Sequence, residues 1–230
     1  MWLSEIILQQ TQTSQGLSYY NKILNTFPTL KKLSEASEEQ ILKLWQGLGY
    51  YSRARNLHFT AKYIQNNLNG VFPDDYDSLL QLKGIGPYTA AAISSICFNE
   101  KRAAVDGNVY RILARVFNID TAINSLEGIK KFQELANSLI SETYPGDYNQ
   151  SMMDIGATIC TPKKPKCNQC PLISICLAKA FNTINNIPVK IKKRKIKIRY
   201  FRYLCIEHNG NFLMKKRTQK DIWRNLYDFP

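Results

Sequence analysis

The sequence predicts a mainly α-helical protein, with a small β-containing domain that begins towards its C-terminal end. Apolar residues recur at helical spacing through the first 185 residues, and strand-like patterns are scarce before residue 188. After residue 188, two β-rich runs flank an Asn-Gly pair. With 230 residues, of which 44% are hydrophobic, the chain can bury one large core or two small ones.

Glycine and proline residues divide the helical region into segments. The first helices are marked by apolar residues at helical spacing: Leu3, Ile6, Ile7, Tyr19, Ile23, Leu24, Ile41, Leu42, Leu44 and Trp45. A longer helix is expected over about residues 52–68, because Gly70 and Pro73 follow it. Further helices are expected near residues 75–81, 87–98, 107–117, 127–143 and 149–159.

The C-terminal part has a different pattern. Residues 186–198 are a basic linker, and the β-rich runs 200–206 and 212–214 follow it. Asn209-Gly210 lies between these runs and is typical of a tight hairpin turn, so a second domain is expected to start near residue 199. Because about 30 residues are too few for an independent core, we expect the chain to be a fragment that stops within this domain.

The net charge of +13 is concentrated in one stretch. Residues 155–206 contain 12 Lys or Arg and no Asp or Glu, so the rest of the chain is nearly neutral. A localised basic patch suits a polyanion, most often nucleic acid; the alternative is a solvated, solubilising surface. The basic run lacks an amphipathic helical face, and no apolar run approaches the ~20 residues that span a bilayer. We therefore expect no membrane partner and, without a secretory leader, a cytoplasmic protein.

Four cysteines form the most specific pattern in the sequence: Cys160, Cys167, Cys170 and Cys176. Their spacing, C-x6-C-x2-C-x5-C, places four soft thiolates within 17 residues, which favours a metal or iron–sulfur site. Disulfides or free thiols are the weaker alternative, because nothing indicates an oxidising compartment. The spacing alone leaves the choice between zinc and an iron–sulfur cluster open.

A glycine-rich turn at residues 82–89 is the second pattern. Gly84 and Gly86 allow a sharp turn, and Pro87 opens a helix of small residues directly after it. Free backbone N–H groups at such a helix start can hold a phosphate, as in a helix-hairpin-helix element that binds DNA. An ordinary tight turn between two helices would also explain a single G-x-G.

Two carboxylates are candidates for chemistry. Asp106 precedes an expected helix, so its simplest interpretation is an N-cap. Glu5 lies in an apolar helix start, and two carboxyl groups in different environments can divide acid and electrostatic roles. The sequence does not show whether the two residues meet.

Several motifs together resemble one family. They are residues 2–12, 48–57, 84–89, 105–108 and 152–157, followed by the four cysteines. In this order they resemble MutY-type adenine DNA glycosylases, which belong to the helix-hairpin-helix DNA glycosylases with an iron–sulfur cluster. Residues 223–230 resemble the start of the Nudix-like domain of that family. The family carries an arm before the first motif, so by this resemblance the chain is truncated at both ends.

The resemblance implies a fold, a reaction and a cofactor. The fold would be a glycosylase domain of two helical subdomains over residues 1–185, with the hairpin at 82–89 and the iron–sulfur loop at 160–176, then a linker at 186–198 and the Nudix-like part at 199–230. The reaction would be removal of adenine mispaired with 8-oxoguanine or guanine in double-stranded DNA, by a monomer that associates with the bacterial nucleoid. The cysteines would hold a [4Fe–4S] cluster that shapes the loop 163–166 to meet phosphates.

The resemblance also implies roles for individual residues. Glu5 would protonate the adenine, Asp106 would stabilise the oxocarbenium-like sugar, and Asn108 and Tyr88 would support this site. Residues at the DNA would be Gln9, Gln10, Thr11, Tyr50, Gly84, Gly86 and Thr89. Tyr88 stands where bifunctional relatives resembling endonuclease III carry a nucleophilic lysine, so a monofunctional enzyme is expected.

Three alternatives stay open at this point. The first is a catalytically weak or inactive fragment that only binds mismatched DNA. The second is a bifunctional glycosylase and lyase resembling endonuclease III. The third is a regulator that binds nucleic acid through zinc.

Overall fold

The computed structural model describes residues 1–191, 198–219 and 221–230. The chain divides into two compact units, Met1–Ile191 and Lys192–Pro230. The first unit is helical and the second contains only short strands among its described residues, so the expected mainly α class is confirmed. In the part of the chain that the structure describes, no helix has the length and apolar character needed to cross a membrane.

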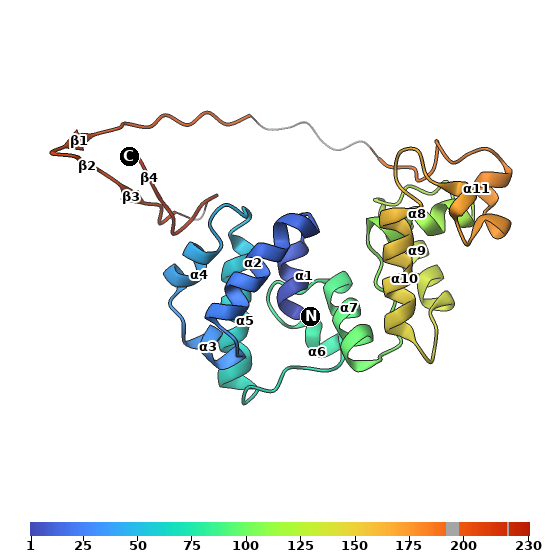
Figure 1. The fold of residues 1–230 in the computed structure, drawn as a ribbon, viewed down its shortest axis with the longest axis horizontal. Coiled ribbons are helices and arrows are strands. Elements are labelled where there is room, and N and C mark those ends of the chain that lie inside the picture. Colours follow the sequence, from blue (N-terminus) through green and yellow to red (C-terminus); the bar gives the residue numbers. More distant parts are fainter. Residues whose placement is uncertain (192–197, 220) are drawn as a thin grey trace. The chain divides into compact units, whose positions relative to one another are not determined.

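The first unit contains eleven described α-helices and two short 3-10 helices (Figure 1). The α-helices are α1 (Trp2–Leu8), α2 (Thr13–Thr26), α3 (Leu30–Glu35), α4 (Glu38–Leu44), α5 (Ser52–Asn67), α6 (Tyr76–Leu80), α7 (Pro87–Phe98), α8 (Gly107–Val116), α9 (Leu126–Leu139), α10 (Pro145–Thr158) and α11 (Leu177–Ala180). The 3-10 helices are η1 (Cys167–Gln169) and η2 (Ile173–Ile175).

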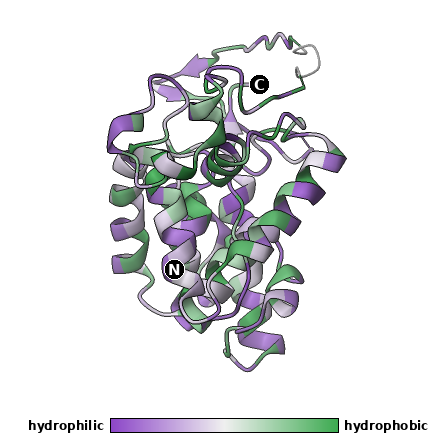
Figure 2. Cartoon of the chain, turned by 90° about the vertical axis from the view of Figure 1, so that its right-hand side faces the viewer, coloured by the Kyte–Doolittle hydropathy of each residue, from purple (hydrophilic) through white to green (hydrophobic). Residues whose placement is uncertain are grey.

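Local sequence chemistry explains where these helices begin. Ser37 forms a capping box with Gln40 at the start of α4, with hydrogen bonds of 3.2 and 2.9 Å. Pro87 and Pro145 stand in the first turns of α7 and α10, where a missing N–H group costs nothing. In Figure 2, apolar and polar residues alternate around the helices, as expected for helices with one face in a core.

Helix α7 joins two helical groups. It contacts α1 and α6 in the N-terminal group and α10 in the C-terminal group (Figure 1). The N-terminal core includes Ile64 of α5, Leu79 of α6 and Ile93 of α7, and each is at most 1% exposed. The C-terminal core is built on α8, α9 and α10, with Phe132 fully buried at its centre. Helix α1 therefore packs on α7, and α8 is joined to α7 through α10, which contacts both.

The second unit contains two short antiparallel pairs. Strand β1 (Glu207–His208) pairs with β2 (Asn211–Phe212), and β3 (Lys215–Lys216) pairs with β4 (Tyr227–Asp228). The expected Asn-Gly turn is present, with φ of 50° at Asn209 and 75° at Gly210. The predicted strand over 200–206 is wrong, because no strand forms there among the described residues. The backbone of this exposed run makes isolated bonds instead: the amide of Leu204 donates to the carbonyl of Pro230, and the carbonyl of Ile206 accepts from the amide of Leu213.

Candidate active site and iron–sulfur loop

Glu5 lies on α1 next to two fully buried residues. Ile6 and Ile7 are 2% and 1% exposed and fix this short helix in the core. Burial raises the pKa of the Glu5 carboxyl, and the negative charge of Asp106 raises it further; a hydrogen bond with Tyr88 and the chain N-terminus oppose this shift. Glu5 therefore holds a proton at higher pH than an exposed glutamate, as a general acid requires.

Tyr88 connects the two helical groups at this point. It is the second residue of α7, and its hydroxyl donates to Sδ of Met153 on α10 at 3.2 Å and lies next to the Glu5 carboxyl, whose pKa it affects. Burial and the charges of Glu5 and Asp106 raise the pKa of Tyr88 well above its usual range. The phenol therefore carries no charge at neutral pH where it faces the Glu5 carboxyl.

Asp106 is the N-cap of α8, and its carboxylate is fully engaged. One oxygen accepts the amides of Asn108 and Val109, each at 2.8 Å, and the other accepts the side-chain Nδ2 of Asn108 at 2.8 Å. The start of the α8 dipole also favours the negative charge. The charge of Asp106 acts on both Glu5 and Tyr88. The structure thus brings together three candidate residues that span about a hundred positions of the sequence.

Asn108 links this site to the cysteine loop through one arginine. Its Oδ1 accepts a bond of 2.7 Å from Nη2 of Arg111, and Arg111 also donates to the carbonyls of Gly156 and Cys160, each at 2.6 Å. Gly156 lets α10 approach closely, because a Cβ there would lie 2.4 Å from Cβ of Asn108. Any larger residue at position 156 would displace the amide that holds Asp106.

The four cysteines line one cavity with an empty volume of about 320 Å³. Burial raises the pKa of the Cys170 thiol, and the charges of Cys160, Cys176 and Cys167 add to this, as expected for neighbouring thiols. Among the described residues, no group of three or more His, Cys, Asp or Glu is arranged to hold a single metal ion.

The positive charge of Arg115 makes this cavity suitable for an anionic sulfur cofactor. Its buried guanidinium lies 3.3 Å from Sγ of Cys160, and it also donates to the carbonyls of Thr161, Pro162 and Ile187. A fixed positive charge beside thiolates stabilises their ionised form. The donor set and the cation together suit a cluster held by Cys160, Cys167, Cys170 and Cys176.

The hairpin before α7 has two different glycines. Gly84 has φ of +88°, and a Cβ there would lie 2.7 Å from Cβ of Asn56, so the fold itself requires glycine. A Cβ at Gly86 would meet nothing within 4 Å. Thr89, in the first turn of α7, is only 3% exposed, so its side chain packs inside the fold and does not present a surface to DNA.

The remaining candidate residues lie on two exposed turns. Gln10 follows the end of α1 and Tyr50 precedes α5, and both adopt left-handed backbone conformations, with φ of 58° and 47°. The ring of Tyr50 is 64% exposed. Gln9 lies near the hairpin, with Nε2 at 3.5 Å from the carbonyl of Gly84, and the hydroxyl of Thr11 accepts a bond from Arg53 at 3.1 Å.

Three further residues contact the site although no motif in the sequence marks them as site residues: Arg53, Arg111 and Met153. The sequence offers one signal for the arginines: each lies in a helix beside apolar residues that prove to be buried, at Ala54 and at Ile112. A charged residue on a core-facing position is rarely buried unless it is paired. Met153 has no comparable signal, because a methionine in an amphipathic helix is ordinary packing.

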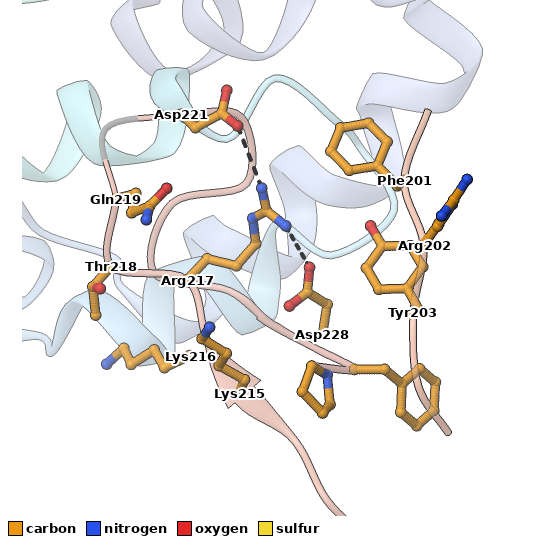
Figure 3. Close-up of a pocket in the computed structure, with 12 residues that line it drawn as sticks. Phe201, Arg202, Tyr203, Lys215, Lys216, Arg217, Thr218, Gln219, Asp221 and Asp228 are labelled. Carbon is orange, nitrogen blue, oxygen red and sulfur yellow. Dashed lines mark hydrogen bonds and ion pairs between the residues drawn. The ribbon is translucent and has the colours of Figure 1, made fainter. Parts of the chain in front are cut away.

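A second hollow lies within the C-terminal unit and has an empty volume of about 830 Å³. Arg217 lies in it between Asp228, at 2.5 Å, and Asp221, at 3.5 Å (Figure 3). Arg199 pairs with Asp221 at 2.6 Å and lowers the pKa of that carboxyl below its usual range. These partly buried ion pairs connect the segments of this unit around the hollow, and none of the candidate residues described above lines it.

Residues 3–138 match the HhH-GPD superfamily base excision DNA repair proteins, and this match covers more than half of the chain. The chain belongs to this superfamily. Residues 160–176 match the iron–sulfur binding domain of endonuclease III, and this range begins and ends at the outer cysteines. The expected [4Fe–4S] cofactor is thereby confirmed, and the zinc alternative is not supported.

The chain is similar to proteins named adenine DNA glycosylase. It is 39% identical over 230 residues to an adenine DNA glycosylase of Buchnera aphidicola subsp. Acyrthosiphon pisum, covering all of this chain and 66% of the relative. It is 44% identical over 180 residues to the adenine DNA glycosylase of Homo sapiens, covering 78% of this chain and 33% of that protein. The chain therefore spans just under two thirds of the Buchnera relative. The expected resemblance to adenine DNA glycosylases is confirmed.

Solved structures show the same fold. A thermostable thymine-DNA glycosylase matches with a TM-score of 0.72 and 29% identity, covering 78% of this chain and 83% of that chain. A non-covalent endonuclease III–DNA complex matches with a TM-score of 0.67 and 21% identity, covering 79% and 84%. The expected helix-hairpin-helix glycosylase fold is confirmed.

Proposed function

We propose that this protein is a DNA glycosylase of base excision repair, which hydrolyses the N-glycosidic bond of adenine paired with 8-oxoguanine or guanine. The observation that carries this proposal is the contact of Glu5 and Tyr88 beside Asp106, which supplies a buried acid next to a fixed negative charge. Similarity along the whole of this chain to 66% of a protein named adenine DNA glycosylase supports the choice of base.

Glu5 is the general acid in this proposal. Its protonated carboxyl donates to the leaving adenine, so the base departs neutral rather than as an anion. The hydrogen bond with Tyr88 orients the carboxyl. Because burial raises the pKa of Glu5, a proton remains available nearer to neutral pH.

Asp106 stabilises the positive charge that develops on the sugar. Three donors from Asn108 and Val109 hold its carboxylate at the start of α8, so no reorganisation is needed as the charge forms. Water then adds to the sugar carbon and leaves an abasic site. The bond from Arg111 to Asn108 fixes the amide that orients Asp106.

Access to the bond requires that adenine leave the duplex. The free amides of the hairpin at Gly84, Gly86 and Thr89 would hold the DNA backbone, as helix starts bind phosphate. Gln9, Gln10, Thr11 and Tyr50 would fill the vacated space and contact the opposing base, because exposed amides and aromatic rings replace lost stacking. The mispair lowers the cost of extrusion, which is a few kcal/mol.

We further propose a monofunctional enzyme that acts as a monomer on DNA in the cytoplasm. Tyr88 stands at the hairpin position where a nucleophilic lysine would be needed for strand cleavage, and its protonated phenol cannot form a Schiff base. The cluster, when bound, serves structure: Arg111 and Arg115 connect its loop to α8, which starts at Asp106.

Single-turnover adenine release tests the proposal. The substrate is a duplex with adenine opposite 8-oxoguanine or guanine, with base treatment to reveal abasic sites. Glu5→Gln should abolish release while duplex binding persists, whereas Glu35→Gln, at an exposed glutamate of α3, should leave the rate unchanged. Trapping by borohydride should fail with the wild-type protein.

Two results would contradict the proposal. Release that survives in Glu5→Gln would remove Glu5 from the acid role. Binding without release by the wild-type chain would favour the alternative of a protein that only binds mismatched DNA, while a borohydride adduct would favour the bifunctional alternative.

A further inference from the structure

Arg53 of α5 connects two turns that are about forty residues apart. It is only 7% exposed, and its guanidinium donates to the carbonyls of Ile6, Ile7 and Gln9 at 3.2, 2.6 and 2.7 Å. The same group donates to the carbonyls of Leu48 and Gly49 at 3.4 and 3.2 Å. One side chain thus contacts the end of α1 and the turn before α5.

The carbonyls that Arg53 contacts have a particular place in the chain. Gly49 directly precedes Tyr50, and Gln9 directly precedes Gln10; Tyr50 and Gln10 both adopt left-handed conformations that are unfavourable for side chains other than glycine and asparagine. Such strain persists only where the surroundings impose it. Arg53 holds the peptide group in front of each strained residue.

Arg53 also ends α1. The carbonyls of Ile6 and Ile7 lie in the last turn of this helix, where they lack partners within the helix. A cation at a helix C-terminus is favourable, and here the two hydrogens of Nη1 are shared among both carbonyls and the acceptors on Gln9 and Thr11. Because α1 has only 7 residues, fixing its last turn also fixes Glu5.

We propose that Arg53 is a positioning residue that couples the turn at Gln10 to the turn at Tyr50 and holds both in register with Glu5. The consequence for catalysis rests on the proposed function. If that function holds, Arg53 keeps Gln10 and Tyr50, which contact the mispair, in a fixed position relative to Glu5, which protonates the base. The guanidinium also lies 5.7 Å from the centre of the Tyr50 ring, so it contacts the Tyr50 side chain directly as well.

The planar guanidinium is what this role requires. Its donors extend in a fixed fork, and Nη1 serves the α1 side while Nη2 serves the turn at Gly49. Lysine keeps the charge but presents its donors from a single nitrogen atom. Arg53→Lys therefore separates the coupling from the charge. Arg102→Lys is a matched control, since Arg102 stacks on Tyr76 and pairs with Glu100 elsewhere in the unit.

Amide hydrogen exchange of the full, cluster-loaded chain tests the coupling without reference to activity. In Arg53→Lys, amides of both turns, residues 9–12 and 49–52, should exchange about tenfold faster or more, with α7 unchanged. In Arg102→Lys, both turns should keep wild-type rates. Faster exchange in only one turn, or in neither, would overturn the proposal.

Adenine release tests the consequence. Arg53→Lys should slow single-turnover release by about 100-fold, the loss typical of a small misplacement. Gln10→Asn, which tolerates the left-handed conformation and keeps an amide, should restore part of this rate in the double variant. A double variant no faster than Arg53→Lys alone would overturn the role of Arg53 in holding Gln10. If the wild-type chain releases no adenine, the proposed function fails, whereas the exchange result still decides the coupling.

Discussion

At the scale of single residues, burial of Glu5 has two opposite effects: it raises the pKa of the carboxyl, and it lowers the stability of the folded chain when that carboxyl is ionised. The same burial that raises the pKa of its carboxyl disfavours the charged form in the folded state. When the pKa of a carboxyl is higher in the folded than in the unfolded chain, the free energy of unfolding is largest at low pH, where the group is protonated in both states. This favourable contribution is present below the unfolded pKa and is lost as the pH rises through the raised folded pKa.

Replacing Glu5 with glutamine should therefore stabilise the folded chain at neutral pH. Glutamine keeps the shape of the side chain without the charge that burial penalises. The difference in melting temperature between Glu5→Gln and the wild type should grow as the pH rises through the raised pKa of Glu5 and shrink as the pH falls, because the wild-type carboxyl becomes protonated at low pH. Thermal unfolding across a range of pH measures the difference. A gain that grows as the pH falls would contradict the raised pKa.

At the scale of elements, the hairpin before α7 assigns separate tasks to its two glycines. Gly84 turns the chain and packs on Asn56, so its requirement is internal. Gly86 has open space at its Cβ position, so the fold does not require glycine there for packing. A close approach by a phosphate would explain the second glycine.

The two alanine variants should separate folding from DNA binding. Gly84→Ala should lower the free energy of unfolding by about 2 kcal/mol or more, from its positive φ and the contact with Asn56. Gly86→Ala should cost less than about 1 kcal/mol, yet weaken the affinity for duplex DNA. Chemical unfolding and duplex binding measure the two effects. Equal losses of stability in both variants would refute this division.

At the scale of the whole molecule, charge and burial are unevenly distributed. The first unit contains the buried core, whereas no described residue of the second unit is buried. The loop between Cys160 and Cys167 exposes Lys163, Lys164 and Lys166 beside the cysteine cavity. These lysines lie on the structured unit, so they can add to DNA affinity without ordering a flexible segment.

Replacing these three lysines with glutamine should reduce the salt dependence of DNA binding. The slope of log Kd against log salt should fall by about 0.9 for each lysine that contacts a phosphate. Lys31→Gln and Lys130→Gln are controls, because each of these lysines pairs with a glutamate one turn further along its own helix, Glu35 on α3 and Glu134 on α9. Titration of a labelled duplex at several salt concentrations gives the slopes. Equal slopes in the triple variant and the wild type would place the DNA elsewhere.

Local features of the fold could be predicted, and features that depend on distant partners could not. The helix over 87–98 was predicted with its bounds, because Pro87 opens it and small residues continue it. Helix α10 begins four residues before the predicted start at 149, since Pro145 opens its first turn. The strand over 200–206 was wrong, because β-propensity alone cannot form a strand without a neighbour to pair with.

The sequence by itself determined the helical class, the hairpin and the four cysteines, because periodicity, turn residues and ligand spacing act over short stretches of chain. Only the tertiary structure decided that Glu5, Tyr88 and Asp106 meet, and that Arg53 spans two turns. Those contacts join residues far apart in the sequence, and they depend on how helices pack. The raised pKa of Glu5 has the same origin, since burial comes from the helices around it and not from its neighbours in the chain.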